Sequence, residues 1–260
     1  SGAVVMPGVG TFVVSLTQVG YGEMQVTTLA NQDGTGEFFT ANDFAVGLSY
    51  ARKIANWFSF GATAKMINSQ IWHESASAFA VDLGVIVKTQ FFSPTGEKGN
   101  GLDIGMSISN YGSRMQYDGI DLIQPIDISI DETGNYGDVI GQYRTQAWEL
   151  PLMFRIGLSY KPIQTSFSSL TLAADALHPN NNSESINVGA EYALKISNAG
   201  KFFVRGGYKA LYMDETEFGL TAGGGIELFA RGNRSVKVDY AFKEAGILGR
   251  THAYTIGLTF

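Results

Sequence analysis

The sequence contains no cysteine, only 6 prolines among its 260 residues, and a charged fraction of only 16%. Without cysteine the chain has no disulfide framework, no thiol nucleophile and no thiolate metal site. It also lacks any run of about 18 apolar residues, the length that a membrane-spanning helix requires. The formal net charge of -6 argues against nucleic acid as a partner, because nucleic-acid binding requires a basic face.

The sequence is rich in glycine and aromatic residues, and its apolar and polar residues alternate. There are 32 glycines, and aromatic residues make up 12% of the chain. Apolar and polar residues alternate over long stretches, such as Leu150 to Tyr160 and the C-terminal stretch that ends at Phe260. Successive side chains of a strand point to opposite faces, so this period of two predicts an all-β protein.

The alternating stretches predict about 12 or 13 strands, mostly of the length that a tilted membrane strand has. They lie near residues 9–29, 41–51, 56–67, 78–89, 101–110, 149–160, 168–176, 185–195, 200–211, 217–229, 232–243 and 250–260. The first stretch is either one long kinked strand or a hairpin that turns at Gly20-Tyr21-Gly22.

The charges inside the predicted strands all fall on the polar parity of the alternation. They are Lys65, Asp82, Asp103, Arg155, Asp175, Glu191, Arg205, Glu227, Lys237 and Asp239. In a soluble sandwich these side chains would face water, and the apolar parity would form the core. In a membrane barrel the same side chains face the lumen, and the apolar parity faces lipid.

Three features favour the barrel over the sandwich. Many glycines share the polar parity, where they suit a crowded interior, and aromatic residues gather near the strand ends as an interfacial girdle. The last strand ends on an aromatic residue, Phe260, which resembles the assembly signal of outer-membrane proteins. We therefore predict a transmembrane antiparallel β-barrel that forms a single domain over residues 1–260, surrounded by the lipid of a bacterial outer membrane.

With Phe260 at the periplasmic end, the connections divide into two sets. The periplasmic turns would be 52–55, 90–100, 161–167, 196–200 and 231–233, and the extracellular loops 30–40, 68–77, 111–148, 177–184, 212–216 and 244–249. Loop 111–148 is either a lid or partner-binding hairpin, or a solvated excursion with its own small hairpin. Its candidate contact residues are Asp118, Asp121, Ile126, Ile128 and Asp131.

Two interpretations of the lumen charges stay open at this point. Opposite charges in a confined space should pair, which would hold the interior together and narrow a pore. Alternatively, Lys65, Arg155 and Arg205 bind an anionic head group such as a fatty-acid carboxylate. No arrangement of the three histidines suggests a catalytic relay or a metal site, so the sequence predicts no enzyme, cofactor or metal.

Several segments resemble the PorV/PorQ-type outer-membrane proteins, which are associated with type IX secretion. They include 45–52, 80–85, 108–112, 174–180, 187–192, 205–208 and 238–241, and the resemblance spans nearly the whole chain. It implies a FadL-like barrel of about 14 strands with a small N-terminal plug. It therefore also implies a segment before Ser1 that this sequence does not contain.

The main functional hypothesis is a non-enzymatic binding or scaffold component of a secretion or cell-surface attachment system. Its partners would be other envelope proteins or secreted proteins, bound through the rim loops. The alternative hypothesis is a FadL-like transporter of hydrophobic small molecules. That alternative predicts an apolar pocket inside the barrel, and a lateral opening near the kink at residues 20–22. A general diffusion porin is disfavoured by the charges expected to fill the lumen.

Overall fold

The computed structural model describes residues 1–93, 96, 101–127, 139–197, 199–213, 216–230 and 234–260. These residues form antiparallel strands and two short 3-10 turns, η1 (Ile120–Leu122) and η2 (Gly246–Leu248). Within this part of the chain, no helix has the length and hydropathy needed to cross a membrane.

One large sheet contains most of the strands. Its neighbours follow the order β1 (Gly2–Met6), β2 (Gly10–Gln25), β3 (Phe38–Ala55), β4 (Phe58–Ile71), β5 (Glu74–Lys88), β6 (Asp103–Gly112), β10 (Met153–Gln164), β11 (Ser168–Pro179), β12 (Ser185–Ile196), β13 (Gly200–Leu211), β14 (Phe218–Phe229), β15 (Ser235–Ala245) and β16 (Arg250–Thr259). The two-residue strand β7 (Asp118–Gly119) pairs with β5. Strands β8 (Ile123–Ile126) and β9 (Val139–Gln142) form a separate two-stranded sheet.

The chain divides into two compact units, which we describe separately. Unit 1 comprises Ser1–Arg52, Gly61–Leu83 and Ser109–Leu152, and unit 2 comprises Lys53–Phe60, Gly84–Ile108 and Met153–Phe260. Strands β3 to β6 run through both units. The single-domain expectation remains a prediction.

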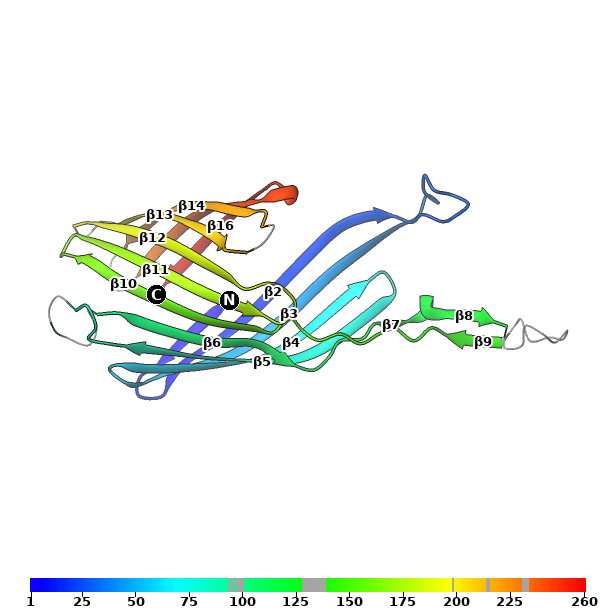
Figure 1. The fold of residues 1–260 in the computed structure, drawn as a ribbon, viewed down its shortest axis with the longest axis horizontal. Coiled ribbons are helices and arrows are strands. Elements are labelled where there is room, and N and C mark those ends of the chain that lie inside the picture. The colour runs from blue at the N-terminus through cyan, green and yellow to red at the C-terminus, as the bar shows by residue number, and fades with distance from the viewer. Residues whose placement is uncertain (94–95, 97–100, 128–138, 198, 214–215, 231–233) are drawn as a thin grey trace. The chain divides into compact units, whose positions relative to one another are not determined.

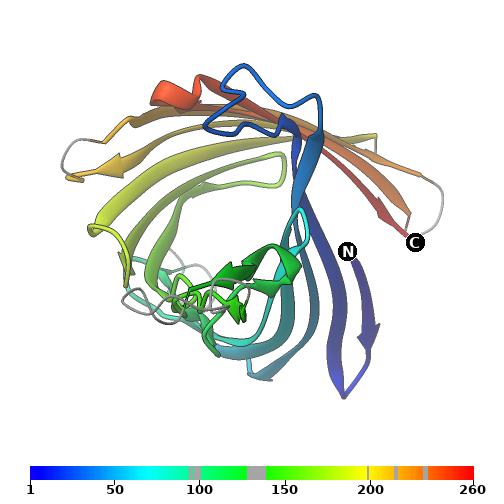
Figure 2. The ribbon, with the colours of Figure 1, turned by 90° about the vertical axis from the view of Figure 1, so that its right-hand side faces the viewer.

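Strands β10 to β16 of unit 2 form an up-and-down meander in which each strand pairs with the next in sequence (Figure 1). Figure 2 shows these strands as a curved wall. Along most of β12 and β13, between residues 185 and 194 and between 201 and 209, the odd-numbered residues are half-buried and the even-numbered residues are exposed. Val204, for example, is 66% exposed, while its neighbours Phe203 and Arg205 are half-buried. We call the shielded side the inner face and the other side the outer face.

In unit 1, the stretch that the sequence left ambiguous is one strand. Strand β2 runs continuously past Gly20-Tyr21-Gly22, and its pairing with β3 shifts register between Gly20 and Glu23. Gly22 has φ +78°, a left-handed conformation that glycine adopts without steric penalty. The hairpin alternative is therefore wrong, and the kink is a β-bulge.

The first part of loop 111–148 packs against the wall of unit 1. Alternate small residues of β5, namely Ala76, Ala78 and Ala80, are almost fully buried beneath Met115 and Leu150. A row of alanines leaves room for these two larger side chains on the face of the strand. The backbones of Met115 and Trp148 pair as a bridge, so both roots of the loop lie on this surface.

The loop between these roots contains its own secondary structure. Strand β7 pairs with β5, and β8 pairs with β9 from Ile123↔Gln142 to Ile126↔Val139. The β8–β9 hairpin and the connection between β2 and β3 project from the same end of unit 1 (Figure 1). Both sequence interpretations of this loop included a hairpin, so its presence does not decide between them, and the role of the loop stays a prediction.

Several predicted boundaries are wrong. The turn predicted at 52–55 lies inside β3, which runs to Ala55, and the loop predicted at 68–77 is a tight turn at Trp72 and His73. Polar residues conceal the strand signal there, but they continue the pairing, as the Asn68 Nδ2 to Ser77 Oγ hydrogen bond of 3.0 Å shows. Strands β10 and β11 also extend to Gln164 and Pro179, into the predicted loops 161–167 and 177–184.

Strand β1 was missed. Its short apolar run has no alternation to mark it, yet it pairs with β2 from Gly2↔Val14 to Met6↔Gly10.

We expect Leu150→Ala to lower the free energy of unfolding by about 2–3 kcal/mol, because it leaves a cavity over the alanine row. Leu150 is only 6% exposed. Urea unfolding of the refolded protein in detergent measures the change. Ile140→Ala is the control, since Ile140 is 78% exposed on β9 and should change stability by less than about 0.5 kcal/mol. Equal effects of the two substitutions would contradict the packing of the loop root.

Candidate functional site: a cavity on the inner face of β11 to β16

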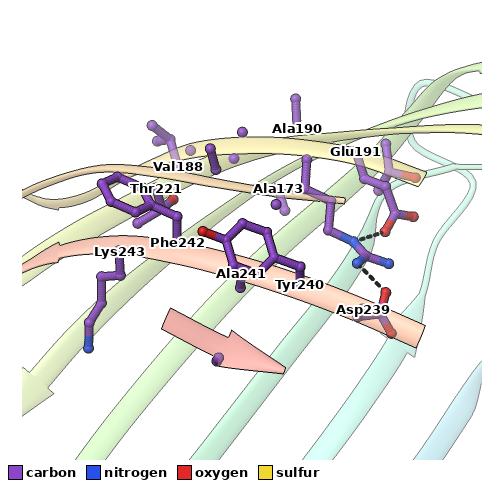
Figure 3. Close-up of a pocket in the computed structure, with 18 of the residues that line it drawn as sticks. Ala173, Val188, Ala190, Glu191, Thr221, Asp239, Tyr240, Ala241, Phe242 and Lys243 are labelled. Atoms are coloured by element: carbon purple, nitrogen blue, oxygen red, sulfur yellow. Dashed lines mark hydrogen bonds and ion pairs between the residues drawn. The ribbon is translucent and has the colours of Figure 1, made fainter. Parts of the chain in front are cut away.

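An open cavity of ≈ 470 Å³ lies against the inner face of strands β11 to β16 in unit 2. Its lining is mainly apolar, and most of the inward side chains are small (Figure 3). The cavity lies within one unit, so strand register alone explains which residues surround it.

Small residues meet in rows that run across the strands. Ala173 lies opposite Gly189, Gly189 opposite Gly207, and Gly207 opposite Thr221. A side chain at Gly207 is excluded, because an added Cβ would lie 2.7 Å from the carbonyl oxygen of Val188. The neighbouring row continues the pattern, with Gly223 opposite Ala241 and Ala241 opposite Ala253. The cavity therefore exists because consecutive strands place short side chains at the same level.

An ionic cluster borders one side of the cavity. The Arg205 guanidinium donates from Nε to Glu191 Oε2 and from Nη1 to Asp239 Oδ1, both at 2.6 Å. Lys237 Nζ lies 3.3 Å from the second oxygen of Asp239. Figure 3 shows the dashed contacts at Glu191 and Asp239, with Lys243 on the opposite side of the cavity.

Glycines in β14 allow this cluster to form. Arg205 lies directly opposite Glu191 on β12, but Asp239 belongs to β15, beyond the intervening strand β14. The β14 residue opposite Arg205 is Gly223, and the one opposite Asp239 is Gly225. An added Cβ at Gly225 would lie 2.1 Å from Asp239 Oδ1. The ion pair thus spans β14 because the two β14 residues between Arg205 and Asp239 are glycines, which have no side chain.

On the other side, Lys243 lines the cavity and shares an aromatic ring with Lys209. Lys209 Nζ lies 3.7 Å and Lys243 Nζ lies 5.9 Å from the centroid of the Phe218 ring. Such cation–π contacts stabilise ammonium groups at partly shielded sites. Pairing shifts register between Phe218 and Thr221, and this irregularity brings an even-numbered aromatic side chain to two inward lysines.

The remaining predicted lumen charges lie in separate environments. In unit 1, Lys65 pairs with Asp82 at 2.7 Å and donates to Asn110 Oδ1 at 2.6 Å. Glu227 contacts Lys201 at 3.8 Å and accepts from Ser235 at 3.0 Å. Asp175 lies opposite Gly157, whose added Cβ would lie 2.4 Å from the Asp175 carboxylate. Among the described residues, Asp103 Oδ1 is shielded from solvent without a hydrogen-bond partner, and Arg155 is exposed.

The inner-face clusters also contain four residues that alternation did not predict there, namely Lys201, Lys209, Lys243 and Phe218. Lysine near a strand end has the same signature as a solvated loop residue, so the sequence offers no signal for Lys201 or Lys209. The position of Phe218 depends on a bulge, which alternation does not reveal.

The candidate contact residues of loop 111–148 do not form one cluster among the described residues. Asp121 contacts the His73 ring at 3.0 Å, and Asp118 accepts from Gln142 at 2.6 Å. Ile126 ends strand β8. Ile128 and Asp131 lie outside the described residues. The proposed role of these residues in binding a partner stays a prediction.

The other two histidines make contacts with single polar groups. His178 lies 3.0 Å from Glu184 at the end of β11, not in a loop as predicted, and His252 Nδ1 lies 2.9 Å from the Tyr240 hydroxyl on the outer face. Over the described ranges, no group of three or more metal-ligating side chains converges.

Comparison with solved structures identifies the architecture. The toluene transporter TodX of Pseudomonas putida superimposes with a TM-score of 0.54 at 10% identity, covering 98% of this chain and 79% of TodX. The TodX deltaS2S3 mutant, a monoaromatic hydrocarbon channel, gives a TM-score of 0.54 at 9% identity, covering 96% of this chain and 77% of that one. The chain has a FadL-like antiparallel β-barrel fold. No family model and no curated protein matches the sequence.

The FadL-like fold agrees with the fold class that alternation and resemblance predicted. At this level of identity the likeness establishes the fold alone. None of the comparisons singles out the PorV/PorQ-type proteins or type IX secretion.

We expect Arg205→Gln to lower the free energy of unfolding by about 2–3 kcal/mol, because it leaves two half-buried carboxylates facing each other. The control is Arg114→Gln, whose ion pair with Glu149 is largely exposed and should contribute about 0–1 kcal/mol. Adding Glu191→Gln and Asp239→Asn to Arg205→Gln should recover part of the loss. Urea unfolding of the four proteins provides the measurement, and an Arg205 effect no larger than the Arg114 effect would refute the coupling.

Proposed function

We propose that this chain is a non-enzymatic channel of the bacterial outer membrane that admits hydrophobic small molecules. The observation that carries the proposal is the apolar cavity on the inner face of β11 to β16, bordered by rows of glycine and alanine. Small-molecule sites are typically concave and mostly apolar, with a few placed polar groups. This cavity has that composition.

The charge balance at the cavity suits an uncharged or weakly polar solute. Glu191 and Asp239 offset Arg205 and Lys237, so the cluster on that side contributes no net charge to the site. Its hydrogen-bonding groups are already engaged with one another. A half-buried charge cluster of this kind stabilises the wall and leaves the apolar surface as the main contact for a solute.

Two further observations support the membrane location and the transport role. Outer-face residues of β12 and β13 such as Tyr192, Phe202 and Val204 are exposed and largely apolar, which is the surface that lipid would cover. The structural neighbours are, by their titles, a toluene transporter and a hydrocarbon channel. These neighbours favour transport over the scaffold role in secretion.

The scaffold role remains a second candidate because of one feature, the β8–β9 hairpin. It projects from unit 1 (Figure 1). Its apolar side chains Ile123 and Ile140 are exposed. An exposed apolar hairpin is a surface that envelope or secreted proteins can bind. A specific role in type IX secretion is a narrower form of this hypothesis.

We expect Ala241→Phe to slow the entry of toluene by about tenfold or more, since the ring would occupy the narrow floor of the cavity. Uptake of labelled toluene by cells that produce the protein measures entry. Val204→Phe is the matched control, because it adds the same ring to the outer face. Unchanged uptake in Ala241→Phe, at equal protein levels in the outer membrane, would rule out this cavity as part of the route.

Affinity purification from gently solubilised outer membranes separates the two candidates. If the chain is a transporter, we expect it to be recovered without stoichiometric protein partners. Recovery of a near-stoichiometric envelope protein, lost on Ile140→Asp in the hairpin but kept on Val204→Asp on the barrel wall, would favour the scaffold instead.

A further inference from the structure

A second concave site lies on the outer face of unit 2, away from the cavity. It is an open groove of ≈ 640 Å³ across the ends of β10, β11, β12 and β13. Its lining is mainly apolar, and its principal side chains are Phe154, Ile156, Ala176, Ile186, Leu211 and Tyr212. The groove shares none of its lining residues with the inner cavity.

Strand register shows why the outer face is hollowed here. Ile156 lies opposite Ala176, Ala176 opposite Ile186, and Ile186 opposite Leu211, so the four side chains form one row across four strands. Residues that pair directly point to the same face of a sheet. Three of the four side chains are long, and the alanine between them is short. Ala176 is thus the floor of the groove, with Ile156 on one wall and Ile186 and Leu211 on the other.

A bulge in β13 completes the second wall. By simple alternation Leu211, an odd-numbered residue, would face inward together with Gly207 and Lys209. Pairing between β12 and β13 shifts register between Ile186 and Val188, which turns Leu211 to the outer face. Ala210 holds a left-handed φ of +60°, and its backbone N–H donates to Asn187 Oδ1 at 2.9 Å.

Tyr212 also has a left-handed φ, of +61°. For a residue other than glycine this backbone conformation costs free energy. It is therefore found only where the surrounding structure holds the residue in it. Ala210 and Tyr212 flank Leu211 on both sides, so the strand departs from regular β geometry where it forms this wall of the groove.

We propose that this groove binds one acyl chain of a membrane lipid. The proposal rests on the proposed function, under which the outer face of β10 to β16 contacts the outer membrane. The groove is continuous with the exposed apolar surface of these strands, which includes Leu158, Leu172 and Val188. At its other end lie His178 and Glu184, which form a polar pair 3.0 Å apart at the β11–β12 connection.

This arrangement fits a lipid chain better than water or a solute in transit. Apolar walls offer water few hydrogen-bonding partners. An empty groove would forfeit dispersion contacts on three sides, and a chain lying over Ala176 recovers them. The polar pair lies where the strands end, at the level at which a head group meets water. A solute in transit would instead occupy the inner face.

The test uses phosphatidylcholine that carries a photoactivatable diazirine on its acyl chain. The protein is reconstituted into phosphatidylcholine vesicles that contain this lipid, irradiated, and mapped by mass spectrometry of its peptides. We expect labelling at Ile186 and Leu211 about tenfold above that at Val204, because ten or so additional carbon–carbon contacts favour the groove. Ala176→Phe, which fills the floor, should reduce labelling to the level of Val204. Val204→Phe should leave the groove labelling unchanged.

The possible outcomes separate this proposal from the proposed function. Uniform labelling over the outer face would overturn the groove but leave the membrane location intact. Absence of labelling over the whole outer face would contradict the membrane location itself. Loss of groove labelling on addition of toluene, with labelling elsewhere unchanged, would make the groove a solute site and overturn the lipid assignment. If Ala176→Phe does not fold, Leu211→Ser removes a wall instead and should lower groove labelling by a similar factor.

Discussion

Antiparallel register is the constraint on which the rest of this structure depends. Each strand of β10 to β16 pairs with its successor over most of its length, and this pairing satisfies the backbone hydrogen bonds. It also fixes which side chains stand at the same level on the same face. The cavity and the outer groove are rows of directly paired residues, and the ionic cluster joins residues of two adjacent rows. A slip of one residue in β12 or β13, the two strands that contribute to all three, would exchange the faces of that strand and disrupt each of them.

Glycines on the inner face have two different effects. Where glycine follows glycine across β12 and β13, the wall is hollow, and where glycine lies between charged residues, an ion pair crosses a strand. Arg205 reaches Asp239 because the intervening β14 residues, Gly223 and Gly225, have no side chains to block the contact. Glycine weakens a strand interior, and the charged contacts above it offset part of that loss. The polar cluster and the apolar cavity are therefore products of one pattern.

Departures from regular pairing occur where alternation alone would have given a different surface. In β2 a bulge bends one continuous strand, where a hairpin was the alternative prediction. In β14 the irregularity brings Phe218 to Lys209 and Lys243. In β13 a bulge turns Leu211 to the outer face. Each one re-aims a side chain without interrupting the sheet, as bulges commonly do. Regular alternation has a similar effect beside the loop that follows β6. There, a row of small alanines on β5 provides the surface against which the two ends of the loop pack.

The alternation of apolar and polar residues by itself determined the all-β class, the position of most strands and the common face of the charged residues. Those properties follow from the period of two, which is local. Only the tertiary structure decided that Arg205 contacts Glu191 and Asp239, that Lys65 contacts Asp82, and that Glu227 contacts Lys201. It also decided that small residues of six strands enclose a cavity, and that Ala176 is the floor of a groove. The physical reason is that register and bulges arise between strands, whereas alternation is a property of each strand alone.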